Sequence, residues 1–121
     1  MQLIRLTEDA IGVSHFSDET IPMTMGDFAP PAPSMWMSPT GPARHLLYLT
    51  LPAGWGGAQH PSPRRQIGFL LSGRVRVEAG DGEIREMAAG GIWRMEDTQG
   101  SGHTTTVIGG EDVHIAIVQL E

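Results

Sequence analysis

The stretch GWGGAQHPSPRRQIGFLLSG, residues 54–73, decides the fold of this chain, because its glycines and polar residues keep a definite spacing. Intervals of five, one, three and six residues separate Gly54, His60, Ser62, Gln66 and Gly73. Residues 66–72 form an apolar run that Gly73 ends, which is typical of a buried strand. Since alternate side chains of an extended chain share a face, His60 and Ser62 are expected to point to the same side.

This spacing resembles the first motif of the cupin family, in which a glycine, two histidines, a glutamate and a closing glycine stand at these intervals. Ser62 takes the place of the second histidine here, and Gln66 takes the place of the glutamate. The resemblance implies an all-β fold, the cupin-type double-stranded β-helix (jelly-roll barrel). It also implies a metal site in which some of the usual ligands are substituted.

The stretch GGIWRMEDTQGSGHTTTV, residues 90–107, resembles the second cupin motif with substitutions. Gly91 stands where the motif opens, Gly100 where it turns, and His103 where it has its third histidine. An aspartate and a threonine replace the usual proline region, and the spacing is longer by one residue. The second motif is therefore a weaker match than the first.

The length of 121 residues predicts one domain, and 16 glycines with nine prolines suit an all-β protein with many turns. Short apolar or alternating runs predict strands at residues 2–6, 13–16, 44–51, 66–72, 74–79, 84–87, 92–95, 104–109 and 113–120. We expect a single cupin domain over residues 1–121. Residues 1–43 are assigned to N-terminal strands and an extended proline-rich arm, and residues 44–121 to the barrel core.

Residues 20–42 are rich in proline, which lacks the N–H group that a sheet interior requires. The segment is therefore expected to be a covering loop or an edge segment. Its Met and Trp side chains, including Met25 and Trp36, suggest packing against a partner subunit. The resemblance implies the same, because arms of small cupins often complete a dimer, so a homodimer is expected.

The composition excludes several classes of chemistry and partner. A net charge of −6 argues against nucleic acid, whose phosphates need a basic surface. All eight basic residues are arginines, so Schiff-base chemistry on lysine is excluded, and the absence of cysteine excludes thiol nucleophiles. The N-terminus does not read as a signal peptide and no apolar run approaches a membrane span, so we expect a cytoplasmic protein without a membrane partner.

The resemblance implies that His60, Gln66 and His103 converge inside the barrel as metal ligands. Two imidazoles and an amide oxygen suit a divalent ion such as Fe, Mn, Ni or Zn, but these neutral donors supply no charge. A nearby Asp97 or Glu96 could restore a negative charge. Without metal, His60 and His103 are candidate catalytic groups for proton transfer in an isomerisation or cyclisation.

Further residues are candidates for the substrate pocket. Ser62 lies within the first motif, and Arg64 shares its parity if the chain stays extended, so its guanidinium could bind a carboxylate or enolate; an exposed Arg64 is the alternative. His45 and Tyr48 lie on opposite faces of one predicted strand, so at most one of them faces inward. Trp93 is expected to help fill the barrel or its mouth.

The leading functional hypothesis is a metal-dependent enzyme of dioxygenase, isomerase or lyase type, acting on a compact polar or anionic small molecule. The alternative is a non-catalytic ligand-binding or sensor protein whose metal site is degenerate. The sequence does not choose among these reactions, because fold does not fix function.

Overall fold

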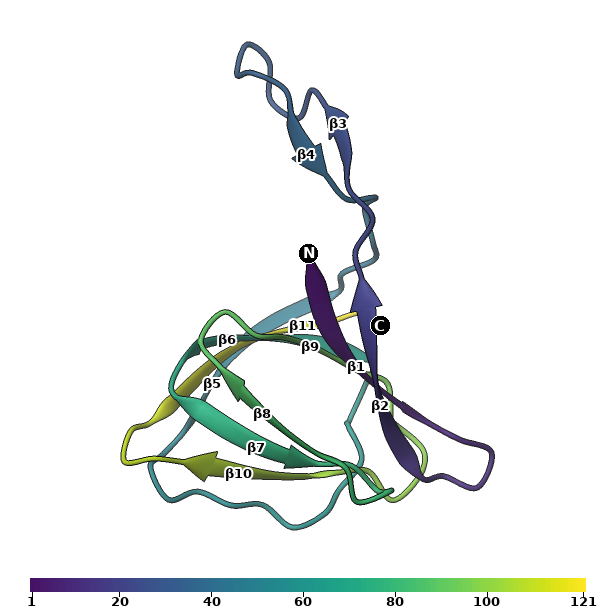
Figure 1. The fold of residues 1–121 in the computed structure, drawn as a ribbon, viewed down its shortest axis with the longest axis vertical. Helices are drawn as coiled ribbons and strands as arrows, with labels where there is room; N and C mark the ends of the chain where they lie inside the picture. The colour runs from purple at the N-terminus through teal and green to yellow at the C-terminus, as the bar shows by residue number, and fades with distance from the viewer.

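The computed structural model describes all residues 1–121 and contains strands but no helix (Figure 1). It therefore has no helix that is long and apolar enough to span a bilayer. The strands are β1 (Gln2–Glu8), β2 (Ser14–Thr20), β3 (Thr24–Gly26), β4 (Met35–Met37), β5 (His45–Leu51), β6 (Gln66–Ser72), β7 (Arg74–Glu78), β8 (Ile84–Ala88), β9 (Ile92–Met95), β10 (Thr104–Ile108) and β11 (Val113–Gln119). The expected all-β architecture is confirmed.

Two sheets enclose the core. The larger sheet has the order β2-β1-β9-β6-β11-β5, and the smaller one has the order β10-β7-β8. Both orders bring together strands that are far apart in the sequence, as a jelly roll requires. In Figure 1 the smaller sheet lies across the open side of the larger one, so that one face of each sheet is turned inward.

Alternation along the strands explains which residues form the core. β7 alternates exposed arginines with Val75 and Val77, both of which are fully buried. On β11, Val113, Ile115 and Ile117 point inward in the same way. These side chains belong to one cluster of 13 buried hydrophobic residues, which gives the barrel a continuous apolar interior.

The N-terminal strands are part of the barrel. β1 pairs with β2 antiparallel and with β9 parallel, so residues 2–20 extend the large sheet. Leu6 is fully buried and Phe16 nearly so, and both belong to the core cluster. The barrel therefore extends beyond the predicted core of residues 44–121, because β1 and β2 pair into the large sheet and contribute side chains to the core.

Residues 21–43 form a protruding hairpin, which we call the hairpin arm. β3 and β4 pair only with each other, and Figure 1 shows them standing away from the barrel. The sequence predicted a covering or edge segment here and missed both short strands. Prolines at positions 30, 31 and 33 lie in the connection between β3 and β4, where no ladder hydrogen bond is needed.

Gly73, the closing glycine of the first motif, permits the tight turn from β6 to β7. Its φ is +80°, and an added Cβ would lie 2.6 Å from the Asp112 carbonyl oxygen. The turn therefore needs both the left-handed backbone and the absence of a side chain. This explains in physical terms why a glycine stands at this point.

His15, at the start of β2, hydrogen-bonds to aspartates in two different turns. Its Nε2 lies 2.7 Å from Oδ2 of Asp9, and its Nδ1 lies 2.9 Å from Oδ2 of Asp81. These hydrogen bonds, the one to Asp9 first, raise the pKa of His15 above 6.5. The pKa of Asp9 is lowered, mainly by its bond to His15, and that of Asp81 is lowered, mainly by the backbone N–H of Glu83.

We expect His15→Ala to destabilise the protein most in mildly acidic solution. Because the folded pKa of His15 is raised, its contribution is fully present below pH 6.5 and is lost as the pH rises through the folded value. Urea unfolding of the wild type and the variant at about pH 5.5 and about pH 9 measures this, with the smaller stability difference expected at the higher pH. A difference that grows with pH would contradict the assignment. The groups are solvent-exposed, so the effect is small.

Candidate functional site

The connection between β5 and β6 and the segment before β10 meet at one end of the barrel. The backbone N–H of His60 donates to the carbonyl of His103, and the N–H of His103 donates to the carbonyl of His60, both at 3.0 Å. The two imidazole rings are 5.1 Å apart between centroids and tilted by 49°. The structure thus brings together two histidines that lie 43 residues apart in the sequence.

Asp97 is fully buried directly behind His103. Its Oδ2 lies 2.6 Å from Nδ1 of His103, and its Oδ1 accepts a hydrogen bond of 2.8 Å from the Ser62 hydroxyl. The side chains of Ser62 and His103 are themselves almost completely buried. A carboxylate only accepts hydrogen bonds, so Nδ1 of His103 carries the proton and Nε2 remains the free nitrogen of the ring.

The ring of His60 is oriented in a similar way by the backbone. Its Nδ1 lies 2.7 Å from the Ala58 carbonyl oxygen, which can only accept, so Nδ1 is the donor. Its Nε2 has no hydrogen-bond partner within the protein. Both imidazoles therefore hold one nitrogen in a fixed hydrogen bond and leave the other available.

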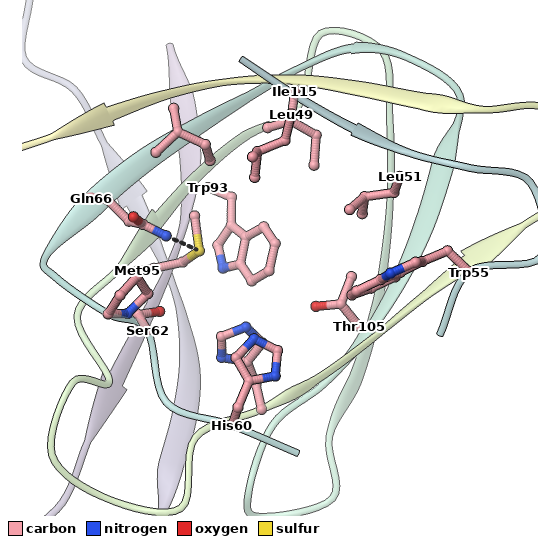
Figure 2. Close-up of a pocket in the computed structure, with 13 residues that line it drawn as sticks. Leu49, Leu51, Trp55, His60, Ser62, Gln66, Trp93, Met95, Thr105 and Ile115 are labelled. Carbon is pink, nitrogen blue, oxygen red and sulfur yellow. Dashed lines mark hydrogen bonds between the residues drawn. The ribbon is translucent and has the colours of Figure 1, made fainter. Parts of the chain in front are cut away.

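Both histidines line a cavity of about 100 Å³ inside the barrel. Figure 2 shows His60 at one end, Gln66, Ser62 and Met95 along one wall, and Leu51, Trp55 and Thr105 along the other. Seven of the 13 lining residues are hydrophobic. Pockets for drug-sized ligands are usually several times larger, so this cavity suits a compact molecule with few polar groups.

Two further polar groups border the cavity without a strong partner. The indole Nε1 of Trp93 is buried and has no hydrogen-bond acceptor, while its ring meets the ring of His103 edge-on at 5.2 Å. The Gln66 amide nitrogen donates to the sulfur of Met95 at 3.6 Å, a weak bond, and its carbonyl oxygen accepts no hydrogen bond from the protein. The cavity therefore offers an unused donor and an unused acceptor.

As a metal site, this set of donors is a weak match. The free nitrogens of His60 and His103 and the Gln66 carbonyl are neutral, and no group of three His, Cys, Asp or Glu side chains comes together. Asp97 binds Ser62 and His103 with its two oxygens, and Glu96 pairs with Arg5 at 2.6 Å. Neither carboxylate faces the free histidine nitrogens, so metal binding by His60, Gln66 and His103 stays a prediction.

The predicted pocket residues divide into two groups. Ser62 and Trp93 line the cavity, as do the three predicted metal ligands. Arg64 lies outside it, because the chain bends after Pro63 and its guanidinium instead donates to the Glu121 backbone carbonyl at 3.4 Å.

Neither of the β5 candidates reaches the cavity. Tyr48 is on the outer face of the sheet with 71% of its surface exposed. His45 has the parity of the inward-facing Leu49 and Leu51 but sits at the exposed start of the strand. Both predictions are corrected: Tyr48 is on the wrong face of the strand, and His45 is on the right face but too far along the strand, which parity does not settle.

The sequence did not identify Asp97 as the residue that positions the other polar side chains of the site. Asp97 was considered as a source of negative charge for a metal, whereas it positions Ser62 and His103. The signal was present as a carboxylate six residues before His103, in the place of the usual cupin proline. Trp55 and Thr105 also line the cavity and had no sequence signal at all.

No protein-family model matches this chain, and no curated protein matches it. Among solved structures, the cupin domain of Cnp3 from Schizosaccharomyces pombe is similar at 15% identity and a TM-score of 0.50, over 89% of this chain and 73% of that one. AerE from Microcystis aeruginosa aligns at 18% identity and a TM-score of 0.48, over 98% of this chain. This chain spans 46% of the length of AerE. The first similarity shows that the fold is that of a cupin.

Proposed function

We propose, from the cupin fold of this chain, that its barrel binds a compact polar or anionic small molecule and moves a proton on it with His103. The observation that carries this proposal is the buried Asp97, which holds Nδ1 of His103 at 2.6 Å and leaves Nε2 free on a ring that lines the cavity. A carboxylate that orients an imidazole in this way is a common arrangement for a general base.

The chemistry follows from the groups around the cavity. Nε2 of His103 accepts a proton from a carbon next to a carbonyl or carboxylate, and the C–H electron pair moves onto the ligand oxygen. The Asp97 carboxylate stabilises the positive charge that forms on the ring. When the ligand is a β,γ-unsaturated acid, Nε2 of His103 returns the proton to the γ-carbon, the electron pair on the oxygen re-forms the carbonyl, and the double bond moves to complete an isomerisation.

A second candidate is the metal-dependent enzyme of dioxygenase, isomerase or lyase type. It is favoured by the hydrogen bonds that hold both rings through Nδ1, because histidine ligands of metals usually have such a partner. His60, Gln66 and His103 would hold the ion, which would act as a Lewis acid on the ligand or as a centre for oxygen chemistry. The third candidate is a protein whose barrel binds a ligand and catalyses no reaction.

Hydrogen–deuterium exchange at the carbon atoms of bound ligands tests the proton transfer. Compact 2-oxo acids and unsaturated carboxylic acids, incubated with the protein in D₂O, are expected to exchange the proton next to the carbonyl or carboxylate. His103→Gln should lower the exchange rate by about 100-fold or more, because the base is lost while the side-chain volume is largely kept. Binding of the same acid should change far less, which separates chemistry from affinity.

The matched control is His114→Gln, because His114 lies on β11 outside the cavity and its Nδ1 bonds to the Thr50 hydroxyl. This variant should exchange at the wild-type rate. Metal content by mass spectrometry is measured on the same samples. A stoichiometric metal that His60→Ala and His103→Ala both lose would support the metal-dependent enzyme instead. Ligand binding without exchange in the wild type would support the binding protein.

A further inference from the structure

Two buried N–H donors on one wall of the cavity lack a strong acceptor. Trp93 is only 3% exposed, and its indole Nε1 has no hydrogen-bond partner in the protein. Gln66 is 8% exposed, and its amide nitrogen, which carries two N–H groups, makes one weak bond, to the sulfur of Met95. Buried donors are almost always paired, so two such groups at one place indicate a position for an acceptor that the chain itself does not supply.

The pairing of β6 with β9 explains why the two donors lie together. Gln66 is opposite Met95 and Gly68 is opposite Trp93, so Gln66 and Trp93 are diagonal neighbours on the inward face of the sheet. In Figure 2 the indole nitrogen of Trp93 is on the side of its ring that faces Gln66 and Met95. Both N–H groups therefore face the region that the thioether of Met95 occupies.

Met95 is a replaceable occupant of that region. A thioether sulfur is a weak acceptor, and a methionine side chain is flexible enough to move aside. Its methyl group lies beside Gly68, where an added Cβ would be 3.2 Å from the methionine Cε. A ligand oxygen that enters between Trp93 and Gln66 would thus replace a weak acceptor by a strong one.

The rest of the cavity offers little else to stabilise a negatively charged oxygen. No arginine lines the cavity, and the chain has no lysine. The Ser62 hydroxyl already donates to the buried carboxylate, and the Thr105 hydroxyl lies on the opposite wall in Figure 2. Proton abstraction by His103 moves an electron pair onto the ligand oxygen, which then needs hydrogen-bond donors. Trp93 and Gln66 are the donors on that wall without a strong acceptor.

We propose that Nε1 of Trp93 and the amide nitrogen of Gln66 form an oxyanion hole, in which two N–H donors stabilise the negative charge on the ligand oxygen. The proposal rests on the proposed proton transfer and names the ligand class as a compact 2-oxo or β,γ-unsaturated acid. When Nε2 of His103 takes the proton, the C–H electron pair forms a C=C bond and the π electrons of the C=O group move onto the oxygen. The proton stays on His103 until it returns to carbon, so no co-reactant is needed.

The position of the base and the identity of residue 66 both support this arrangement. The rings of Trp93 and His103 meet edge-on with centroids 5.2 Å apart. A carbonyl oxygen and the neighbouring C–H carbon are two bonds apart, so the base and the donor to oxygen have to be adjacent in this way. Gln66 also stands where the cupin motif has a glutamate. A carboxylate would repel the negative oxygen, whereas an amide donates to it.

Trp93→Phe and Gln66→Leu each remove one donor, and they keep an apolar ring and a side chain of similar size, respectively. With pyruvate and with the unsaturated acids, each variant should lower the maximal rate of C–H exchange in D₂O by about 100-fold. The acid concentration that gives half the maximal rate should change by less than about 10-fold, because the oxygen carries less charge before the proton moves. The matched control is Trp36→Phe on the exposed hairpin arm, which should exchange at the wild-type rate.

The indole N–H signals in ¹⁵N–¹H NMR spectra give a readout that does not depend on catalysis. The chain has three tryptophans, so Trp36→Phe and Trp55→Phe assign two signals and leave that of Trp93. Saturating pyruvate or unsaturated acid should move the Trp93 signal of the wild type downfield, as a new hydrogen bond does. The Trp36 signal should stay in place.

The two measurements separate this proposal from the proton transfer on which it rests. A downfield shift of the Trp93 signal without C–H exchange would support the donor pair as an oxygen-binding site and contradict proton transfer by His103. Exchange with an unmoved Trp93 signal would overturn the oxyanion hole and leave the proton transfer intact. A wild-type exchange rate in a folded Trp93→Phe or Gln66→Leu variant, or a set of acids none of which moves the Trp93 signal, would overturn the oxyanion hole as well.

Discussion

Gly102→Ala is expected to cost about 4 kcal/mol or more of folding stability, a large part of what a small domain has. An added Cβ would lie 1.9 Å from the His60 carbonyl oxygen and 2.3 Å from the backbone nitrogen of Pro61. These are backbone atoms, so no side-chain rotation relieves the overlap. The residue also has a φ of +79°, which adds a conformational penalty for any residue with a side chain.

The steric overlap lies at the contact between the two motifs, where the backbones of His60 and His103 pair. The two backbone hydrogen bonds between His60 and His103 would have to break, at roughly 1 kcal/mol each. The buried bond from the Ser14 hydroxyl to the Gly102 carbonyl would be disturbed as well. Urea unfolding and the NMR signals of the two histidines measure the effect.

Gly109→Ala provides the matched control for this substitution. Gly109 has a φ of +83°, but an added Cβ there meets no atom within 4 Å. It should therefore show the backbone penalty alone, about 1–2 kcal/mol. Equal losses for Gly102→Ala and Gly109→Ala would mean that the close approach of the two motifs contributes nothing to stability.

Asp97→Ala is expected to cost about 3 kcal/mol. The substitution leaves the Ser62 hydroxyl and Nδ1 of His103 without their partner in a buried region. Each unpaired buried polar group costs about 1–3 kcal/mol, and the lost carboxylate leaves space that the neighbours fill incompletely. Glu111→Ala removes an exposed carboxylate that makes no hydrogen bond, and it should change stability by less than about 0.5 kcal/mol.

A double-mutant cycle shows whether Asp97 acts through its hydrogen bonds. Ser62→Ala alone should cost about 1 kcal/mol, because it removes one donor from the buried carboxylate. In the Asp97→Ala background the same change should cost nothing, since the hydroxyl has no partner left to lose. Additive losses would show that Ser62 and Asp97 contribute independently, against the arrangement described above.

The strands of the barrel were largely predictable because their signal is local. The alternation of arginine and valine in β7 and the apolar run of β6 identify both strands with bounds that agree within a residue. The hairpin arm was not predictable in the same way. Its two strands have three residues each, too few for a periodic pattern to appear among the prolines.

The candidate site was predictable in its members and not in their roles. Motif spacing selected His60, Ser62, Gln66 and His103, and all four line the cavity. It gave no reason for Ser62 to bond to Asp97, because that contact spans 35 residues of sequence and depends on how two loops meet.

By itself, the sequence determined the β-strands, the cupin-like spacing of the polar residues and the absence of lysine and cysteine chemistry. These are properties of residue type and of short-range alternation. Only the tertiary structure showed that Asp97 lies behind His103 and that Arg64 and Tyr48 lie outside the cavity. It also showed that the hairpin arm stands away from the barrel. Such facts depend on how distant segments pack together, and local sequence does not encode depth or distance between them.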